Sequence, residues 1–412
     1  MSTTSEFAKS IPRKAIHIPA STPRSTIALS SGTSSPHITS SRVDNLITKG
    51  NVVKSKGAIV IEFGNKLTKI GISGEYQPRS VIRSQISLPN ETKEIPVFAN
   101  DYSEVQQKTL LTAFMKKIFY QILIGPLKER NILIVQRCFC NERIEKIITG
   151  IFKVKPSFCP KEIKFLTSEV AASIALYCSE ALLAVDIGFT YSSVVPIIHY
   201  NLLMQEGEIS MAGAEALEKK VRELLLSEGK VTINATREVK AIDEEIIKIL
   251  DQTKIYEDIC NKYLLVTTFD RSRKLGTAEQ ESAPKSVEIP IGSEYTIIVS
   301  GKIRETAAEV FFGSDIDTIT IPEAILATLI SCPLDYRRSL FERISVTGGA
   351  STIPGFLGRL RKELEFAVTT DSYKELRKIG SPAFVLYENA NITTGLVTNW
   401  IGGSLYGTYT YK

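Results

Sequence analysis

The sequence predicts an α/β protein built from two related halves, and three observations support this fold class. A strand–acid–x–Gly–strand pattern occurs twice, in GAIVIEFGNKLTKIGISG (57–74) and in LLAVDIGFTYSSVVPI (182–197). Apolar strand-like segments alternate with helix-like segments, as layered α/β domains require. The chain has 412 residues, of which 43% are hydrophobic, which is enough for a large core in two domains. The repeated hairpin predicts two α/β domains around a ligand cleft.

Residues 1–52 are predicted to form a disordered, basic tail rich in Ser, Thr and Pro. They contain six Lys or Arg, whereas Glu6 and Asp44 are the only acids. Such a segment cannot bury enough apolar surface to offset its ordering entropy. An acid-poor, Ser-rich N-terminus is also typical of a mitochondrial transit peptide, so this alternative stays open.

Composition argues against several classes of partner and ligand. The net charge of +5 is modest, and a nucleic-acid-binding protein usually shows a clear basic stripe. No apolar stretch approaches the roughly 18 residues of a membrane helix, so membrane insertion is not expected. The six cysteines are scattered, and Cys138-x-Cys140 lacks the paired spacing of a zinc site. We therefore expect reduced, buried thiols in a cytosolic protein and predict no metal.

Each half follows its hairpin with alternating elements. We expect the first half to span 53–180 and the second half 181–345. In the first half the pattern predicts an amphipathic helix (about 103–124), a buried strand NILIVQRC (131–138), a helix (about 141–152) and a helix TSEVAASIALYC (167–178). In the second half it predicts a helix AGAEALEKKVRELLLSEG (212–229), a polar connector or partner-specific insertion (about 270–290) and a strand YTIIVSG (295–301).

A third motif begins the last segment, 346–412, which we expect to return to the first half. ISVTGGASTIPGFLGRLRKEL (344–364) predicts a strand, a Gly348-Gly349 turn and then a helix. Ser351 or Thr352 can cap this helix, and Pro354 fits its first turn. Glycines allow a close approach of backbone to ligand, and the N–H groups at a helix start favour anions.

Two acid-x-Gly hairpins and this Gly-Gly turn, in this order, resemble the motifs of actin and its relatives over roughly residues 56–407. ISGEYQPRSVI (72–82) and NWIGGSLYG (399–407) resemble further actin segments. The resemblance implies the actin-like, duplicated ribonuclease-H-like fold, with two α/β domains around a nucleotide cleft. It implies ATP or ADP as a possible cofactor, and it maps nucleotide contacts onto Gly64, Asn65, Lys69, Asp186, Gly188, Gly213, Gly348 and Gly349.

The same alignment shows departures that predict a loss of ATP hydrolysis. The first hairpin has Glu62 where the family has an Asp, and the second has Phe189 where a further Asp is usual. The water-positioning Gln and His of the family align with Ala171 and Ser193, so no group remains to orient the attacking water. Base contacts of the family also align with altered residues, namely Cys260, Asn261, Thr352 and Ile353. We therefore expect a protein that is not an enzyme.

SCPLDYRRSLFERISVTGGASTIPGFLGRL (331–360) resembles the divergent members of the family at the pointed end of the dynactin filament. The segment 73–107 is shorter than the protruding subdomain of actin, as a filament cap would allow. The chain stops at Lys412, where actin continues through further helices. The implied partners are the actin-like filament subunit of dynactin, other pointed-end subunits and, indirectly, dynein. The implied location is the cytoplasm and its cytoskeleton.

Two alternatives remain open. Divergent nucleotide loops also suit a nuclear actin-related subunit of a chromatin-remodelling complex, although no clear basic import cluster occurs. A working ATPase or sugar-kinase-like enzyme is the second alternative, and the residues at positions 171 and 193 argue against it.

Overall fold

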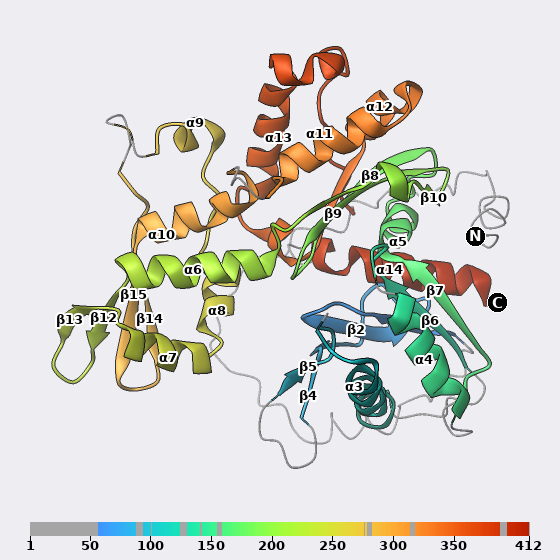
Figure 1. Ribbon diagram of the computed structural model, residues 1–412, viewed down its shortest axis with the longest axis horizontal. Helices are drawn as coiled ribbons and strands as arrows, with labels where there is room; N and C mark the ends of the chain where they lie inside the picture. The colour runs from blue at the N-terminus through green and yellow to red at the C-terminus, as the bar shows by residue number, and fades with distance from the viewer. Residues whose placement is uncertain are drawn as a thin grey trace, which may run out of the picture. The chain divides into compact units, whose positions relative to one another are not determined.

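The computed structural model describes residues 57–87, 94–99, 101–123, 130–140, 142–154, 159–275, 277, 282–313, 318–387 and 394–411. Figure 1 shows how their helices and strands are arranged. The predicted tail at 1–52 lies outside these ranges, as does part of the segment 73–107. The domain boundaries proposed from the sequence stay predictions. No helix within the described ranges is long and apolar enough to cross a membrane.

The first half is built on a five-stranded sheet in the order β3-β2-β1-β6-β7. β1 and β2 form an antiparallel hairpin, β3 pairs antiparallel with β2, and β6 and β7 run parallel to β1. The bounds are β1 Ile59–Glu62, β2 Leu67–Ile72, β3 Ser80–Arg83, β6 Asn131–Gln136 and β7 Glu162–Thr167. A separate two-stranded ladder joins β4 (Gln85–Ile86) to β5 (Ile95–Pro96).

Alternating side chains give this sheet two buried faces. Ile59 and Ile61 of β1 pack in one core with α3 (Glu104–Lys117), the short π-helix η1 (Ile118–Ile122) and α4 (Glu142–Val154). Val60, between them, points to the opposite face, where α14 (Thr394–Thr410) contacts β1 and β6. Helices on both faces explain why β1 and β6 are continuous apolar runs.

The second half repeats this plan. Its sheet has the order β10-β9-β8-β16, with β11 also paired to β9. β8 and β9 form the antiparallel hairpin and β16 runs parallel to β8, just as β6 runs parallel to β1. The bounds are β8 Ala181–Ile187, β9 Ser192–Ile198, β10 Asn201–Leu202, η3 Met204–Glu206, β11 Glu208–Ser210 and β16 Ile344–Thr347. The predicted duplicated α/β fold is confirmed.

Two central helices join the halves. α14 packs along α5 (Ser168–Ala175) and also contacts β1, β6 and β16 (Figure 1). Adjacent glycines set this packing. A Cβ on Gly402 would lie 1.7 Å from the backbone oxygen of Ala171, and one on Gly403 would lie 2.5 Å from Val135. The side chain of Trp400 is fully buried, and its indole N–H donates to the Val60 carbonyl over 3.2 Å.

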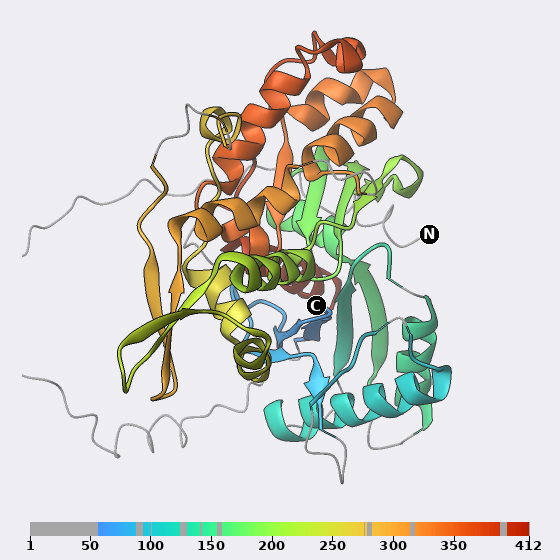
Figure 2. The same cartoon turned by 60° about the vertical axis from the view of Figure 1, so that its left-hand side comes forward.

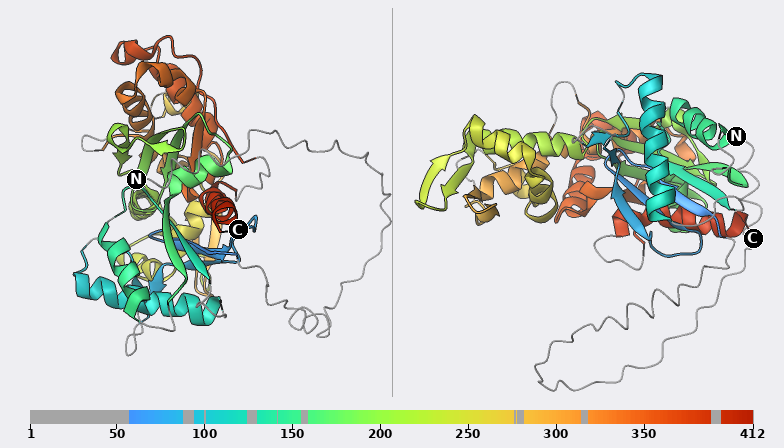
Figure 3. Two further views of the ribbon diagram at one scale, coloured as in Figure 1. Left: turned by 90° about the vertical axis from the view of Figure 1, so that its right-hand side faces the viewer. Right: turned by 90° about the horizontal axis from the view of Figure 1, so that it is seen from below.

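The second half carries a further sheet and most of the remaining helices. α6 (Ala214–Glu228) leads into a four-stranded antiparallel sheet of order β13-β12-β15-β14, which Figure 2 shows at the far end of α6. α11 (Ile321–Ser331) and α13 (Phe356–Ala367) pack into the large core beside β8 and β16 (Figure 3). The remaining bounds are β12 Lys230–Ile233, β13 Glu238–Ala241, α7 Glu244–Gln252, α8 Ile255–Lys262, α9 Phe269–Ser272, β14 Val287–Ile291, β15 Tyr295–Val299, α10 Gly301–Thr306, η4 Ala307–Phe311, α12 Leu334–Phe341, η5 Gly349–Thr352 and η6 Asp371–Leu376.

One sequence prediction about the third motif is wrong. The helix does not follow the Gly348-Gly349 turn with a cap at Ser351 or Thr352. Those residues lie in the 3₁₀ turn η5, where each hydroxyl donates to a carbonyl three residues earlier. α13 begins at Phe356, after Gly355 in the left-handed conformation (φ 91°). Gly355, rather than a hydroxyl residue, sets the helix start because a positive φ there favours glycine.

Candidate functional site

The turns of the two hairpins face each other across the cleft between the halves. The Asn65 side-chain amide donates to the Thr190 hydroxyl over 2.9 Å. The Lys66 ammonium lies 4.7 Å from the centre of the Phe189 ring. The turn residues of one hairpin therefore contact the turn residues of the other, through a hydrogen bond and a cation–π contact.

Lys69, the predicted phosphate lysine, is paired within its own hairpin. The β1–β2 register places Lys69 directly opposite Glu62, and the ammonium is 2.5 Å from Glu62 Oε1. Both side chains are buried. Burial raises the pKa of Glu62, and the neighbouring Lys69 opposes that rise. Glu62 Oε2 is buried without a hydrogen bond to another described residue.

Asp186, the predicted acid of the second hairpin, is paired with an arginine that the sequence analysis did not single out. Arg137 follows β6 directly, and its Nε lies 3.1 Å from Asp186 Oδ2. The guanidinium also donates to the Asp186 carbonyl, the Tyr191 carbonyl and the Ser193 hydroxyl over 2.9–3.0 Å. A signal for Arg137 was present in the sequence, because a polar residue at the carboxyl end of a buried parallel strand often lies at a site.

A second missed residue, Glu169, lies beside this pair. Its carboxylate accepts from the Cys138 N–H (3.1 Å), the Cys138 thiol (3.2 Å) and the Ser193 hydroxyl (3.4 Å). Burial raises the pKa of Glu169 and of the Cys138 thiol, which therefore stays protonated as a donor. Ser193, at the aligned histidine position, is thus held between Arg137 and Glu169.

The predicted glycines are packed against protein atoms rather than left open, with one exception. An added Cβ would lie 2.7 Å from the Leu67 carbonyl at Gly64, 2.3 Å from Arg137 Nη1 at Gly188 and 2.5 Å from the Phe189 carbonyl at Gly213. At Gly348 it would lie 2.0 Å from the Ile187 carbonyl. At Gly349 the nearest atom is 3.9 Å away. The first backbone N–H groups of α6, which a phosphate would otherwise attract, donate to the carbonyls of Gly188 and Phe189.

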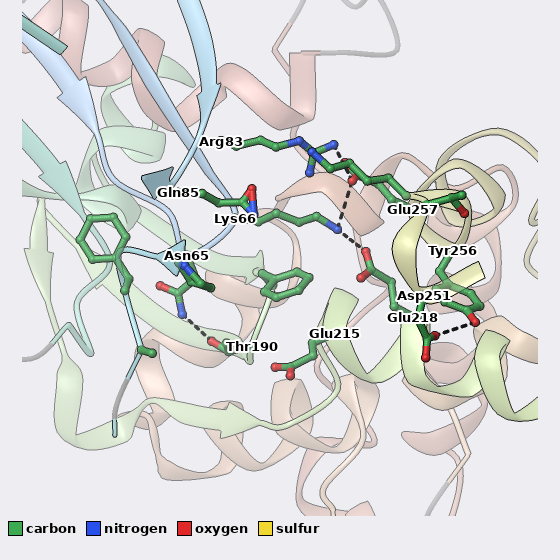
Figure 4. A pocket seen from close by; sticks show the side chains of 16 residues that line it. Asn65, Lys66, Arg83, Gln85, Thr190, Glu215, Glu218, Asp251, Tyr256 and Glu257 are labelled. Carbon is green, nitrogen blue, oxygen red and sulfur yellow. Dashed lines mark hydrogen bonds and ion pairs between the residues drawn. The ribbon is translucent and has the colours of Figure 1, made fainter. Parts of the chain in front are cut away.

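A pocket of about 510 Å³ opens beside the two turns and is lined by both halves (Figure 4). Lys66 reaches across it to the carboxylates of Glu218 and Glu257, and Arg83 lies 2.7 Å from Glu257. These are ion pairs between the first half and helices α6 and α8. Cys260, at an aligned base contact, is buried in α8, and burial raises its pKa to about 12.

These contacts test whether a metal–nucleotide pair fits the inner cleft. A hydrated divalent ion needs carboxylate oxygens that are not already neutralised by a protein cation. Here Lys69 pairs with Glu62, and Arg137 pairs with Asp186. Among the described residues, no group of three or more His, Cys, Asp or Glu side chains could hold a metal ion. In this conformation the inner cleft does not fit the pair, and nucleotide binding by the predicted residues stays a prediction.

Facing hairpins in a duplicated α/β fold define the class of protein. The family model described as "Actin" matches residues 53–410, and the chain belongs to the actin family. It is similar to "Actin-related protein 10" of Dictyostelium discoideum, with 23% identity over 85% of this chain and 82% of that protein. It is also similar to "Actin-related protein 6" of Drosophila melanogaster (23% identity; 77% and 87% covered) and to "Putative actin-29" of Dictyostelium discoideum (25%; 85% and 89%).

The buried carboxyl group of Glu169 predicts a pH-dependent stability. Burial raises the pKa of Glu169 above the usual Glu value of 4.5. The folded state therefore keeps a proton that the unfolded state releases. The resulting stability is complete below pH 4.5 and is lost as pH rises through the folded-state pKa. We expect the free energy of unfolding, and with it the melting temperature, to fall as the pH rises above 4.5. The slope of the free energy is at most about 1.4 kcal/mol per pH unit for one group.

Glu169→Gln should make this pH slope shallower, because it removes the carboxyl group whose pKa is raised and keeps an acceptor for the Cys138 N–H. Thermal unfolding at several pH values measures the slope. Glu223→Gln, an exposed change on α6, is the matched control. An unchanged slope in Glu169→Gln would remove Glu169 from this explanation.

Proposed function

We propose that this protein is a non-catalytic actin-related subunit of the dynactin complex that caps the pointed end of its actin-like filament. In that position it supports dynein-driven transport along microtubules in the cytoplasm. One observation supports the proposed loss of catalysis. The residues at the predicted phosphate, metal and water positions are paired with other groups of the same chain. Lys69, Asp186 and Ser193 all have protein partners.

Catalysis by phosphoryl transfer depends on positioning and on charge neutralisation at the phosphate. Lys69 is paired with Glu62, and Asp186 is paired with Arg137. Lys69 could neutralise a phosphate, and Asp186 could help to position a metal ion, only if these buried ion pairs were broken. Breaking such a pair by removing one partner costs about 3–5 kcal/mol. The fully buried Ala171, at the aligned glutamine position, has no group to orient a water. The fold therefore serves as a rigid shape for assembly.

The pointed-end assignment rests on three supports. The segment 331–360 resembles the dynactin class of the family, and the chain is similar to an "Actin-related protein 10" over most of both lengths. The short segment between the first hairpin and α3 also suits a cap. A subunit with little protrusion offers little to a next filament subunit.

The second candidate function is a nuclear subunit of a chromatin-remodelling complex. The similarity to an "Actin-related protein 6" favours this candidate. Its partners would be a remodelling ATPase and nuclear actin, so the two candidates predict different companions.

Affinity purification of the endogenous protein with mass spectrometry of its companions tests the assignment. Recovery of an actin-like filament subunit together with dynein-associated proteins is the expected result. Recovery of a remodelling ATPase with nuclear actin would replace the dynactin proposal by the nuclear one. Phosphate release from ATP by the purified protein tests the loss of catalysis separately, and sustained turnover would contradict it.

A further inference from the structure

Arg137 is a cation of the first half that is embedded in the second half. It leaves the carboxyl end of β6 and donates to three groups of the β8–β9 hairpin: the carbonyls of Asp186 and Tyr191 and the Ser193 hydroxyl. Nη1 and Nη2 make these hydrogen bonds, whereas Nε lies 3.1 Å from the Asp186 carboxylate in an ion pair without a hydrogen bond. The Arg137 side chain is 14% exposed. An arginine that forms a fork of this kind is pre-organised for several bonds at once.

The hairpin is shaped around this guanidinium. The Tyr191 ring lies 3.8 Å from the guanidinium carbon, so ring and cation stack. Gly188 leaves the space that Arg137 fills, because a Cβ there would lie 2.3 Å from Nη1. Gly188 therefore has a packing reason that involves no ligand.

Charge at this point is balanced by the chain itself. Arg137 forms its ion pair with Asp186, and it also faces Glu169, whose pKa is raised by burial and to which the Cys138 thiol donates. A bound divalent ion would be a third strong positive source next to Arg137 and Lys69. The guanidinium already supplies the positive charge that Asp186 needs in a buried setting.

We propose that Arg137 is a built-in cation that replaces the metal ion at Asp186 and fastens β6 to the β8–β9 hairpin, so that the two halves stay closed without metal or nucleotide. The inference rests on the proposed loss of hydrolysis but does not depend on which assembly the protein joins. In this view the more exposed ion pairs from Lys66 and Arg83 to Glu257 add further links between the same two halves.

A competing interpretation gives Arg137 a different role. The guanidinium would swing away from Asp186 and bind a phosphate of a nucleotide, since arginine forks also match phosphate oxygens. The two interpretations predict different effects of removing the side chain. If Arg137 is a built-in cation, its removal lowers the stability of the ligand-free protein. If Arg137 binds a phosphate, its removal lowers the affinity for nucleotide.

The test compares melting temperatures of the full-length protein with EDTA, with Mg²⁺ and with millimolar Mg·ATP. For the native protein we expect the three values to agree within about 1 °C. Arg137→Ala should melt roughly 5 °C lower in EDTA, because it leaves Asp186 buried without its cation. Mg·ATP should raise the melting temperature of this variant by at least as much as it raises that of the native protein, because the space beside Asp186 is then open.

Matched variants keep the result interpretable. Arg222→Ala removes another Arg–Asp pair of 3.1 Å, but on the exposed surface of α6, and should change the melting temperature by less than about 1 °C. If Arg137→Ala does not fold, Arg137→Lys takes its place. This variant keeps the charge and loses the forked hydrogen bonds, so it should fold and have a melting temperature below that of the native protein.

Two results would overturn the inference. One is a native protein stabilised by several degrees by Mg·ATP, with that shift lost in Arg137→Ala. The other is an Arg137→Ala variant, or an Arg137→Lys variant where the first does not fold, as stable as the native protein. Phosphate release measured in the same samples separates this failure from a failure of the proposed function. Turnover would contradict the loss of hydrolysis, whereas Mg·ATP stabilisation that is lost in Arg137→Ala, without turnover, would contradict only the role of Arg137.

Discussion

Gly402→Ala is expected to destabilise the protein by roughly 3 kcal/mol, although it adds a single methyl group. The added Cβ would lie 1.7 Å from the Ala171 carbonyl oxygen and 2.3 Å from its carbon. Both atoms are backbone, so no side-chain rotation can relieve the overlap. α14 and α5 would have to move apart, and α14 also contacts β1, β6 and β16. The change therefore disturbs both halves, and thermal unfolding measures it.

Gly150→Ala is the matched control, since it makes the same change inside α4, where a Cβ would meet no atom within 4 Å. Alanine is the better helix former, so this variant should be more stable by about 0.5–1 kcal/mol. Equal melting temperatures for the two variants would contradict the close backbone packing of α14 on α5 at Gly402.

The duplicated fold could be predicted because its central strands are buried on both faces. β1, β6, β8 and β9 are short apolar runs that end in turn residues, and this pattern survives any change in cleft chemistry. β7 was missed for the opposite reason. Its sequence EIKFLT lies at the sheet edge and is mostly half-exposed, so it shows no apolar run. The predicted helix start at Ser351 failed because a left-handed residue, Gly355, begins α13 instead.

The site could be predicted by position but not by contact. Asp186 and Lys69 stand out in their hairpins, and the hairpin register alone would have placed Glu62 opposite Lys69. The contact of Arg137 with Asp186 joins residues 49 positions apart on different sheets. Nothing in the local pattern of either strand shows which side chain crosses the cleft. The same holds for Lys66 and Glu218, which are 152 positions apart.

The Gly348-Gly349 turn of the third motif offers a test of whether packing or a ligand determines the shape of the cleft. Gly348 has φ 94°, and a Cβ there would lie 2.0 Å from the Ile187 carbonyl at the end of β8. Gly348→Ala should cost about 2–4 kcal/mol, from the left-handed backbone and the overlap together. Thermal or urea-induced unfolding of the ligand-free protein measures this cost.

Gly349→Ala is the natural partner of this experiment, because the two glycines are adjacent and both were predicted to contact nucleotide. A Cβ on Gly349 would have only the Leu396 side chain near it, at 3.9 Å, so this variant should stay within about 0.5 kcal/mol of the native protein. Packing alone thus separates the pair by several kcal/mol in stability. If instead Gly349→Ala lowered a measurable affinity for ATP while leaving stability unchanged, the open side of this turn would be a nucleotide contact. The closed cleft would then be one of two states rather than the working form.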